Sequence, residues 1–346
     1  MDLGPAELAF RYRNGFEEAF DFDVASFPYF LLLHRAGHPP RIDFPKAMKP
    51  APFKYIAPRS REEALAVKAE HGEEAWFLAG GQSLVPALNF RLAQPAILID
   101  LNTVPDLGGI RRHEDRALRI GALTRHAAVE RDALVERHHP LIHEAMPFIA
   151  HPQIRNRGTL GGNLSHADPA SEMPAIVLAL GGRLRAQKAG GERWIDAADF
   201  FVGALTTALE VNEMLAEIEL PDLPPDAGTC FMEVSRRRGD FAMMGVAAVV
   251  ALGADGTCAE ARLAYCGAGD GPVSAADAAQ SLVGTSLKAE DIKEAAALAQ
   301  QAVDPLGNIH ASKDYQRHLA GVLTRRALVT AVGRARIAVR SEERTA

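Results

Sequence analysis

The sequence predicts an α+β protein, and three observations lead to this prediction. Strand and helix patterns alternate from Met48 to Leu220, a linker rich in Pro, Asp and Gly covers residues 221–228, and strands followed by helices come after it. Of the 346 residues, 48% are hydrophobic and 24% are charged. This composition suits a globular protein of two or three lobes with a substantial core.

Residues 1–47 are much richer in aromatic residues than the remainder of the chain. We interpret them as an N-terminal extension, non-native or disordered, with Met48 as the native start. The alternative is a genuine aromatic arm that docks on a partner. Peptides from before Met48 in protein purified from its source would exclude the first interpretation.

The next segment carries local signals for one helix and two strands. Ser60 and Glu63 have the spacing of a capping box, and Gly72 is placed to end the helix. Residues 75–79 and 96–101 are typical of short buried strands. We therefore expect a strand, a turn at the glycines and a second strand.

A further α/β stretch is expected from Leu118 to Leu220. Thr124 is predicted to cap a helix, residues 172–180 to form a helix that Gly181 ends, and strands to lie near Leu184 and Met214.

Beyond the linker, the pattern predicts a small sheet and a helical tail. Residues 230–235, 241–252 and 258–266 are expected as strands, with a hairpin turn at Asp255 and Gly256. A long amphipathic helix is predicted over residues 312–338.

Two glycine-rich loops are the strongest candidates for a binding site. Paired glycines let main-chain N–H groups approach a phosphate, and consecutive N–H groups in a tight turn form an anion-binding nest. Neither loop has the GxGxxG or GxxxxGK[ST] spacing, and each alone is compatible with an ordinary turn. The residues are Ala79, Gly80, Gly81, Gln82, Ser83 and Leu84 in one loop, and Thr159, Leu160, Gly161, Gly162, Asn163 and Leu164 in the other.

An acidic segment follows the second loop. Asp168 and Glu172 stand at the entry of an apolar helix, where a carboxylate could accept hydrogen bonds from a ribose diol. The same residues would also cap the helix at the positive end of its dipole. One role does not exclude the other.

Other functional classes find little support. The net charge of −6 and the lack of a basic stripe argue against nucleic-acid binding. Cys230, Cys258 and Cys266 have no CxxC spacing, which favours free thiols and cannot supply the four ligands of an iron–sulfur cluster. His139 and His143 could share a helix face, but no third metal ligand is apparent.

Sequence features also bear on location. No apolar run approaches the length of a membrane-spanning helix, and the N-terminus has no signal-type pattern. We therefore expect a cytoplasmic protein without a membrane span.

Four motifs in register carry a family resemblance. The AGGQSL loop, the TLGGN loop with DPASE behind it, the segment SRRRGDFA at 235–242 and the helix DYQRHLAGVLTRR at 314–326 are arranged in one order. From about Met48 to Ala338 the chain resembles the FAD-binding medium subunit of the xanthine dehydrogenase and carbon monoxide dehydrogenase (molybdenum hydroxylase) family.

The resemblance implies a fold, a site and a division into domains. The fold would be the FAD-binding fold of the vanillyl-alcohol-oxidase (PCMH) type in two α/β lobes, plus a C-terminal lobe of small antiparallel sheet and helices. The FAD-binding domain would cover 48–224, with lobes 48–101 and 102–224, and the C-terminal domain 229–338. In this family both glycine loops bind the FAD pyrophosphate, the position of Glu172 reaches the adenosine ribose, and Leu215 and Met232 fall near the flavin ring. Met232 replaces a lysine found in some relatives.

The resemblance also implies the role of the chain. FAD, held non-covalently because Gln82 stands where covalent relatives usually have histidine, would pass electrons from 2Fe-2S clusters to a terminal acceptor. The clusters and the molybdenum cofactor would lie only on a small and a large partner subunit, in a dimer of heterotrimers. Two rival interpretations are a stand-alone flavin oxidase or reductase, and an assembly subunit that has lost flavin. The substrate and the acceptor stay open.

Overall fold

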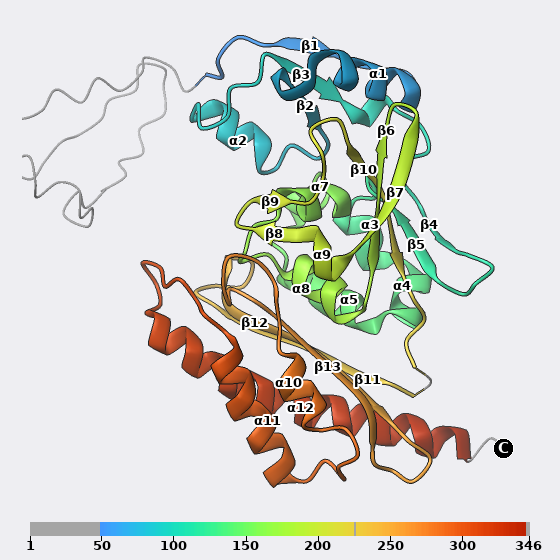
Figure 1. Cartoon of the computed structure of the whole chain (residues 1–346), viewed down its shortest axis with the longest axis vertical. Coiled ribbons are helices and arrows are strands. Elements are labelled where there is room, and N and C mark those ends of the chain that lie inside the picture. The colour runs from blue at the N-terminus through green and yellow to red at the C-terminus, as the bar shows by residue number, and fades with distance from the viewer. Residues whose placement is uncertain (1–48, 225, 344–346) are drawn as a thin grey trace, which may run out of the picture. The chain divides into compact units, whose positions relative to one another are not determined.

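The structure is a computed structural model that describes residues 49–224 and 226–343 (Figure 1). Our expectations for residues 1–47 and for Met48 concern a segment outside the described residues. Within residues 49–343 the helices and strands form two α/β lobes and a C-terminal sheet that is packed against helices, as predicted.

The first lobe contains a parallel sheet of three strands in the order β1-β3-β2. Its elements are β1 (Lys54–Ile56), α1 (Arg61–His71), the 3-10 turn η3 (Gly72–Glu74), β2 (Ala75–Leu78), α2 (Leu84–Asn89), β3 (Ile97–Asp100) and η4 (Leu101–Thr103).

Local signals placed the first helix correctly, with one difference. Ser60 caps α1, because its hydroxyl accepts from the Glu63 N–H at 3.1 Å, and Gly72 ends the helix with φ +52°. The Glu63 carboxylate, however, accepts from the N–H of Arg59 at 2.7 Å and not from that of Ser60. The reciprocal bond of a capping box is therefore displaced by one residue.

The expected strand–turn–strand unit is wrong in its connection. Strands β2 and β3 are parallel, so the chain must cross back between them, and the six-residue helix α2 does so. This helix has Pro86 inside it and is too short to show a helical period in the sequence.

The second lobe packs helices on one face of a five-stranded antiparallel sheet in the order β4-β5-β10-β6-β7. The strands of this sheet are β4 (Ile110–Arg112), β5 (Leu118–Gly121), β6 (Arg183–Lys188), β7 (Gly191–Asp196) and β10 (Met214–Leu220). Strands β8 (Phe201–Gly203) and β9 (Thr206–Thr207) of this lobe form a separate two-stranded sheet. The helices of the lobe are α3 (His126–Arg131), α4 (Ala133–His138), α5 (Pro140–Ala145), η5 (Met146–Phe148), α6 (Pro152–Arg155), α7 (Leu160–His166), α8 (Glu172–Ala179) and α9 (Ala197–Phe200).

Thr124 does not cap a helix, which corrects our prediction. Helix α3 begins at His126, and its N-cap residue is Arg125. The Thr124 hydroxyl donates to the carbonyl of Gly121 at 2.7 Å and accepts from the N–H of Gly109 at 3.0 Å. It therefore fastens the turn after β5 to the chain before β4.

Strand β10 contributes side chains to the cores of both lobes, because a β-bulge interrupts the alternation of its side chains between the two sheet faces. Met214 and Ala216 belong to the core of the first lobe, whereas Ile218 belongs to the core of the second. The register shift between Leu215 and Glu217 turns the following acidic residues to the outer face of the sheet.

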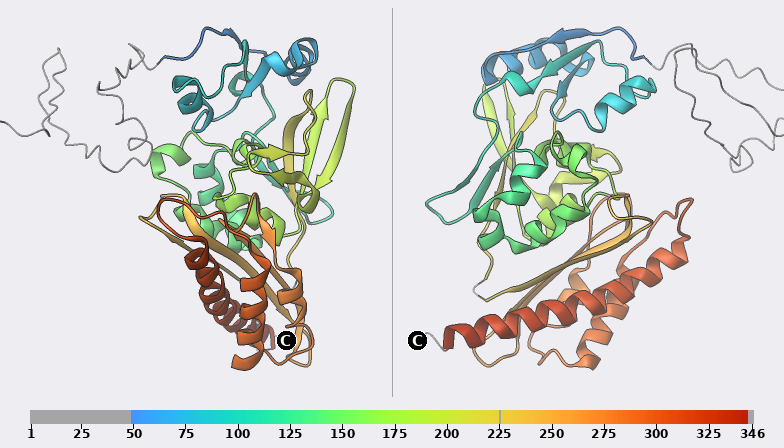
Figure 2. Two further views of the ribbon diagram at one scale, coloured as in Figure 1. Left: turned by 60° about the vertical axis from the view of Figure 1, so that its left-hand side comes forward. Right: turned by 180° about the vertical axis from the view of Figure 1, so that it is seen from behind.

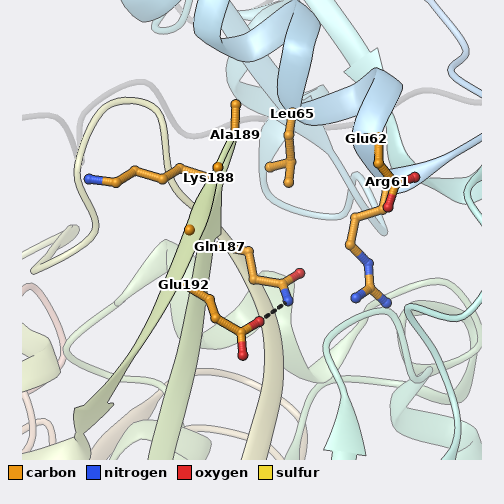
Figure 3. Close-up of a pocket in the computed structure, with 9 residues that line it drawn as sticks. Arg61, Glu62, Leu65, Gln187, Lys188, Ala189 and Glu192 are labelled. Atoms are coloured by element: carbon orange, nitrogen blue, oxygen red, sulfur yellow. Dashed lines mark hydrogen bonds between the residues drawn. The ribbon is translucent and has the colours of Figure 1, made fainter.

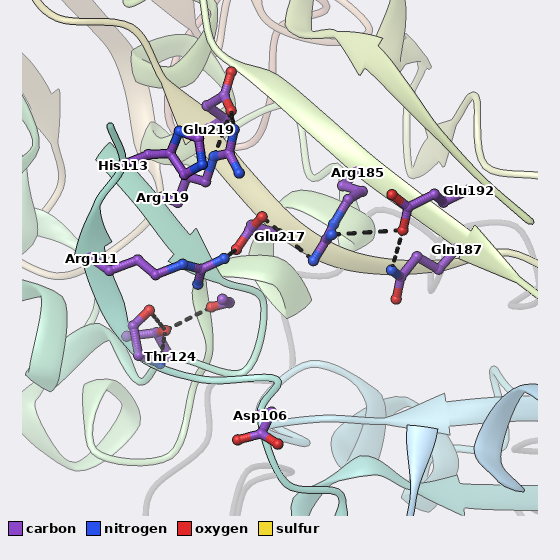
Figure 4. Close-up of polar contacts among 12 residues, drawn as sticks. Asp106, Arg111, His113, Arg119, Thr124, Arg185, Gln187, Glu192, Glu217 and Glu219 are labelled. Atoms are coloured by element: carbon purple, nitrogen blue, oxygen red, sulfur yellow. Dashed lines mark hydrogen bonds and ion pairs between the residues drawn. The ribbon is translucent and has the colours of Figure 1, made fainter. Parts of the chain in front are cut away.

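The outer face of this sheet carries a network of ion pairs around Glu217 and Glu219 (Figure 4). Glu217 pairs with Arg111 and Arg185, although its side chain is only 2% exposed. Arg119 donates to Glu219 at 2.7 Å. Three arginines of this face lie over the ring of Trp194, namely Arg119, Arg183 and Arg185.

The C-terminal region is an antiparallel sheet in the order β11-β12-β13-β14, with helices on one face. Its elements are β11 (Gly228–Ser235), β12 (Ala242–Leu252), β13 (Cys258–Cys266), β14 (Val273–Ser274), α10 (Ala276–Gln280), α11 (Ala289–Ala302) and α12 (Lys313–Glu343). Helix α12 thus runs further than the predicted end at residue 338.

The C-terminal sheet lies between two sets of helices, as Figure 2 shows for the long helix α12 on one side and the second lobe on the other. Phe231 and Ala247 belong to the core shared with the second lobe, whereas Cys230 and Val246 belong to the core formed with α10, α11 and α12. Both faces of the sheet are therefore buried.

Candidate functional site

The structure brings the two glycine-rich loops into direct contact. A Cβ atom on Gly80 would lie 2.8 Å from the Cα of Gly158 and would overlap the carbonyl of Arg157. A Cβ atom on Gly162, in the second loop, would lie 3.6 Å from the Cβ atom of Ala79, in the first loop. Since real Cβ atoms do not come as close as 3.0 Å to main-chain atoms, only glycine at position 80 permits this approach.

The first loop presents main-chain N–H groups that donate no hydrogen bond to the described residues. The N–H groups of Gly80, Gly81, Gln82 and Ser83 have no acceptor within the part of the chain that the structure describes. Gly81 has φ +73°, and the Gln82 side chain donates to the carbonyl of Gly80 at 3.2 Å. Consecutive unengaged N–H donors of this kind form an anion-binding nest.

The second loop differs, and this corrects the expectation that its N–H groups form a similar nest. The N–H groups of Leu160, Gly161, Gly162 and Asn163 donate to acceptors within the chain at 2.8 to 3.1 Å. One of these acceptors is the hydroxyl of Thr159, the N-cap residue of α7. The second loop can contribute close approach and side-chain groups, but its own main chain satisfies these donors.

Two polar side chains connect the loops. The Asn102 amide donates to the carbonyl of Ala79 at 2.8 Å, which fixes the start of the first loop. The Arg125 guanidinium donates to the Asn102 side-chain oxygen and to the carbonyl of Arg157, next to the second loop. Arg125 also pairs with Thr159 in an isolated β-bridge. These contacts hold both loops in one arrangement.

Glu172 is connected to the second loop through its neighbours. The Asn163 amide is hydrogen-bonded to the hydroxyl of Ser171, the N-cap residue of α8, at 2.8 Å. Glu172 follows as the first residue of that helix and is 5% exposed. Burial, with a smaller contribution from the negative charge of Asp168, raises the pKa of Glu172 to about 7.

A second carboxyl group faces the same region from the C-terminal sheet. Glu233, Gly245 and Cys266 are paired across β11, β12 and β13, on the sheet face that packs against α8. Both side-chain oxygens of Glu233 are buried without a hydrogen-bond partner among the described residues. Burial and the charge of Glu172 raise the pKa of Glu233 to about 8.

The two residues expected near the flavin ring lie in different surroundings. Leu215 is buried in β10. The carbonyl of the next residue, Ala216, accepts a hydrogen bond from the main-chain N–H of Ala122. Gly161 of the second loop packs directly against Ala122. Met232 is on the other sheet face from Phe231 and packs against the core formed with the C-terminal helices. The structure therefore brings Leu215 close to the second loop and does not bring Met232 there.

The segment before the second loop is supported by buried polar groups. Arg155 is 8% exposed, forms an ion pair with Glu130 at 2.9 Å, and donates to the carbonyls of Ile149 and Ala150. The His126 ring lies against Gly158, and burial followed by the charge of Arg155 lowers its pKa to about 4. The ring is therefore neutral at ordinary pH.

His139 and His143 do not assemble a metal site. His139 is fully buried, and neither of its ring nitrogens has a hydrogen-bond partner in the described part of the chain. Burial lowers its pKa to about 4. Within the described ranges, no group of three or more His, Cys, Asp and Glu side chains could hold a metal ion.

An open hollow lies elsewhere, between α1 and the β6–β7 hairpin (Figure 3). Arg61, Glu62, Leu65 and residues 187–192 line it, and Gln187 donates to Glu192 at 2.6 Å. No residue of either glycine loop lines this hollow, so it is a feature separate from the candidate site.

Sequence reasoning missed several residues of this site. Asn102, Arg125 and Glu233 belong to no motif, so their position became apparent only in the folded chain. For Arg157 there was a signal, because it directly precedes the glycines of the second loop and a cation beside an anion-binding turn is informative.

Comparison with known protein families explains this arrangement. Residues 51–223 match the FAD-binding domain in molybdopterin dehydrogenase, and residues 229–331 match the CO dehydrogenase flavoprotein C-terminal domain. The chain belongs to this family of FAD-binding medium subunits. It is accordingly an FAD-binding oxidoreductase subunit of the molybdenum hydroxylase type, and the resemblance drawn from the four motifs is confirmed.

Relatives of this medium-subunit family align over nearly their whole length. The 6-hydroxypseudooxynicotine dehydrogenase complex subunit alpha of Paenarthrobacter nicotinovorans is 41% identical, over 84% of this chain and 97% of its own. The carbon monoxide dehydrogenase medium chain of Afipia carboxidovorans is 38% identical, over 84% and 100%.

Solved structures of the family share the fold. A carbon monoxide dehydrogenase from Hydrogenophaga pseudoflava matches with a TM-score of 0.80 and 35% identity, over 82% of this chain and 99% of that chain. Quinoline 2-oxidoreductase from Pseudomonas putida 86 matches with a TM-score of 0.79 and 35% identity, over 83% and 99%. The predicted PCMH-type α+β fold is confirmed. In the described residues of this medium subunit, no helix is both long and apolar enough to cross a bilayer.

Proposed function

We propose that this subunit holds FAD non-covalently where the two glycine-rich loops meet, and that it relays electrons between a partner subunit and a terminal acceptor. FAD accepts electrons singly and releases them in pairs, so it can connect iron–sulfur clusters to a two-electron acceptor. The protein contributes binding, orientation and electrostatics.

The proposed site uses residues from both lobes. The N–H groups of the first loop would bind the pyrophosphate, the second loop would support it with the hydroxyl of Thr159, and Glu172 would accept from the adenosine ribose. Leu215 and Met232 are proposed near the flavin ring. The full set is Ala79, Gly80, Gly81, Gln82, Ser83, Leu84, Thr159, Leu160, Gly161, Gly162, Asn163, Glu172, Leu215 and Met232.

The contact between Gly80 and residues 157–158 is the observation that carries this proposal. It brings unengaged N–H donors of the first loop beside the second loop, which is what a pyrophosphate gripped from two sides requires. The buried, unpartnered oxygens of Glu233 near Glu172 also fit a ligand with hydroxyl donors.

We propose the quaternary assembly and the location by analogy with the relatives. The partners would be a large molybdopterin subunit and a small subunit with 2Fe-2S clusters, in a cytoplasmic dimer of heterotrimers. Residues 48–224, in lobes 48–101 and 102–224, would form the FAD-binding domain, and residues 229–338 the C-terminal domain. The three cysteines of this chain are all buried in the C-terminal sheet, which supports placing the clusters elsewhere.

The absorbance spectrum of the purified subunit near 370 and 450 nm, before and after acid precipitation, tests the cofactor. We expect a flavin band that moves to the supernatant with acid. A band that stays with the pellet would contradict non-covalent binding. A colourless, folded protein that takes up no added FAD would contradict the whole proposal.

Purification from its source tests the assembly. We expect two further chains to elute with this one, together with molybdenum and iron in the same fractions. A flavin-loaded chain that elutes alone and oxidises an organic substrate would instead support the stand-alone oxidase.

A further inference from the structure

We propose that Arg125 and Arg157 form a cationic pair that balances the charge of the FAD diphosphate at the junction of the loops. The inference rests on the proposed function, because it assumes that a dinucleotide occupies this junction. It adds two residues to the site that are not part of either glycine motif.

The geometry fixes Arg125 at the junction. Its guanidinium donates to the carbonyl of Arg157 and to the side-chain oxygen of Asn102. These two bonds use two of the five N–H donors of a guanidinium, so the group is oriented and donors remain for a ligand. Because Asn102 also holds the carbonyl of Ala79, Arg125 keeps a constant position relative to the first loop.

Within the described ranges, the two cations are not paired with a carboxylate. Among the described residues, neither Arg125 nor Arg157 forms an ion pair, although most arginines on the neighbouring sheet do. Burial and the positive charge of Arg157 lower the pKa of Arg125, which indicates that the two like charges are close and poorly compensated. Such an arrangement is unfavourable unless an anion joins it.

One carboxylate acts on Arg125, but it is already engaged. Asp100 raises the pKa of Arg125 through its charge, without forming an ion pair with it. Its own oxygens accept from the hydroxyl of Tyr55 and from the main-chain N–H and side-chain amide of Asn102. The junction therefore keeps an excess of positive charge.

Neutral donors and cations meet at this place. The unengaged N–H groups of residues 80–83 belong to the loop that touches Arg157 through Gly80. A diphosphate, which carries negative charge on two adjacent phosphoryl groups, can take donors from the loop and charge from the two arginines together.

The test is the dissociation constant for FAD of the reconstituted full chain at low and high salt, with Arg125→Gln, Arg125→Lys and Arg131→Gln. Arg131 is the matched control, because it is exposed at the other end of α3 and makes no ion pair among the described residues. If charge is what matters, Arg125→Gln weakens FAD binding roughly ten- to a hundredfold and reduces its salt dependence. Arg125→Lys stays within about threefold of the unmodified chain, and Arg131→Gln does not differ from it.

Two outcomes overturn the inference while leaving the proposed function intact. In the first, the unmodified chain binds FAD and Arg125→Gln binds it equally well with the same salt dependence. In the second, Arg125→Lys loses FAD as completely as Arg125→Gln. That result would mean that Arg125 acts through its hydrogen bonds to Asn102 and Arg157 and not through its charge. Arg157→Gln provides an independent check, because the Arg157 side chain is exposed and makes no hydrogen bond or ion pair with the described residues. We expect a several-fold weaker affinity. An unmodified chain that binds no FAD would contradict the proposed function itself.

Discussion

Arg155 and Glu130 form a two-point ion pair, at 2.9 and 3.2 Å, directly before the second glycine-rich loop. The same guanidinium donates to the adjacent main-chain carbonyls of Ile149 and Ala150 at 3.1 Å, so one buried side chain connects two segments to its own. The position of the loop that touches Gly80 depends on this arginine.

We therefore expect Arg155→Met to destabilise the protein by roughly 3 kcal/mol, because it leaves a partly buried carboxylate and two carbonyls without their donor. Equilibrium unfolding by urea measures this change, with exposed Arg131→Met as the control. Equal stabilities of the two variants would show that the ion pair contributes little.

Gly80→Ala should weaken cofactor binding without unfolding the chain. The added methyl group would meet main-chain atoms of residues 157–158, so the two loops must move apart. A displacement that costs about 1–3 kcal/mol corresponds to a roughly five- to 150-fold loss of FAD affinity. Gly191→Ala is the matched control, since nothing lies within 4 Å of its added carbon. Unchanged FAD content of purified Gly80→Ala would refute this explanation of the glycine.

The pH dependence of stability should follow the carboxyl groups of Glu172 and Glu233. Their pKa values, about 7 and about 8, are raised above the ordinary value of 4.5. Protonation therefore favours the folded state, and this contribution is complete below about pH 4.5 and lost as pH rises through 7 to 8. His126 and His139, with pKa values lowered from 6.5 to about 4, act in the opposite direction, because the unfolded chain loses their protons near pH 6.5. Their contribution to stability therefore rises with pH and is nearly complete at pH 7.

We expect the apoprotein to lose a few kcal/mol of stability between pH 6 and pH 9 from the two carboxyl groups. Glu233→Gln should remove most of the loss and be more stable than the unmodified chain at pH 9. Exposed Glu114→Gln should leave the profile unchanged. The measurement is the melting temperature of the unmodified chain and both variants as a function of pH over this range. The same pH dependence in all three proteins would exclude a role for Glu233.

Gly333→Ala should stabilise the protein. Gly333 lies inside the long helix α12, its φ is not positive, and nothing lies within 4 Å of where the added carbon would stand. Alanine in a helix interior is favoured over glycine by about 0.5–1 kcal/mol. Gly228→Ala is the opposite case, because its added carbon would collide with the main chain of α12, and it should be strongly destabilising. A lower unfolding midpoint for Gly333→Ala would contradict the helix argument.

Local features of the fold could be predicted because they depend on neighbouring residues. The cap at Ser60, the helix end at Gly72 and the hairpin turn at Gly256 each follow from one side chain or one glycine with positive φ. Where a side chain had two possible uses, as with Thr124 and Glu63, the sequence did not distinguish them.

The site was predicted only in part, because some of its residues are neighbours in the sequence and others meet only in the folded chain. Its glycines form visible motifs, whereas Asn102, Arg125 and Arg157 come together only because strands and loops distant in sequence meet. The occupied N–H groups of the second loop were equally hidden, since their acceptors belong to residues 122, 124 and 159. Hydrogen-bond partners of this kind are a property of tertiary packing.

The burial of Cys230, Cys258 and Cys266 has a practical consequence. Burial raises the thiol pKa of Cys230 and Cys258 to about 11 and that of Cys266 well above its usual value, so all three react poorly with alkylating reagents. These are all the cysteines of the chain. A cysteine introduced at exposed Leu205 or Glu114 would then be the one site open to a maleimide dye or nitroxide label. Cysteines introduced at both positions would allow a distance across the second lobe to be followed in solution without first removing a native thiol.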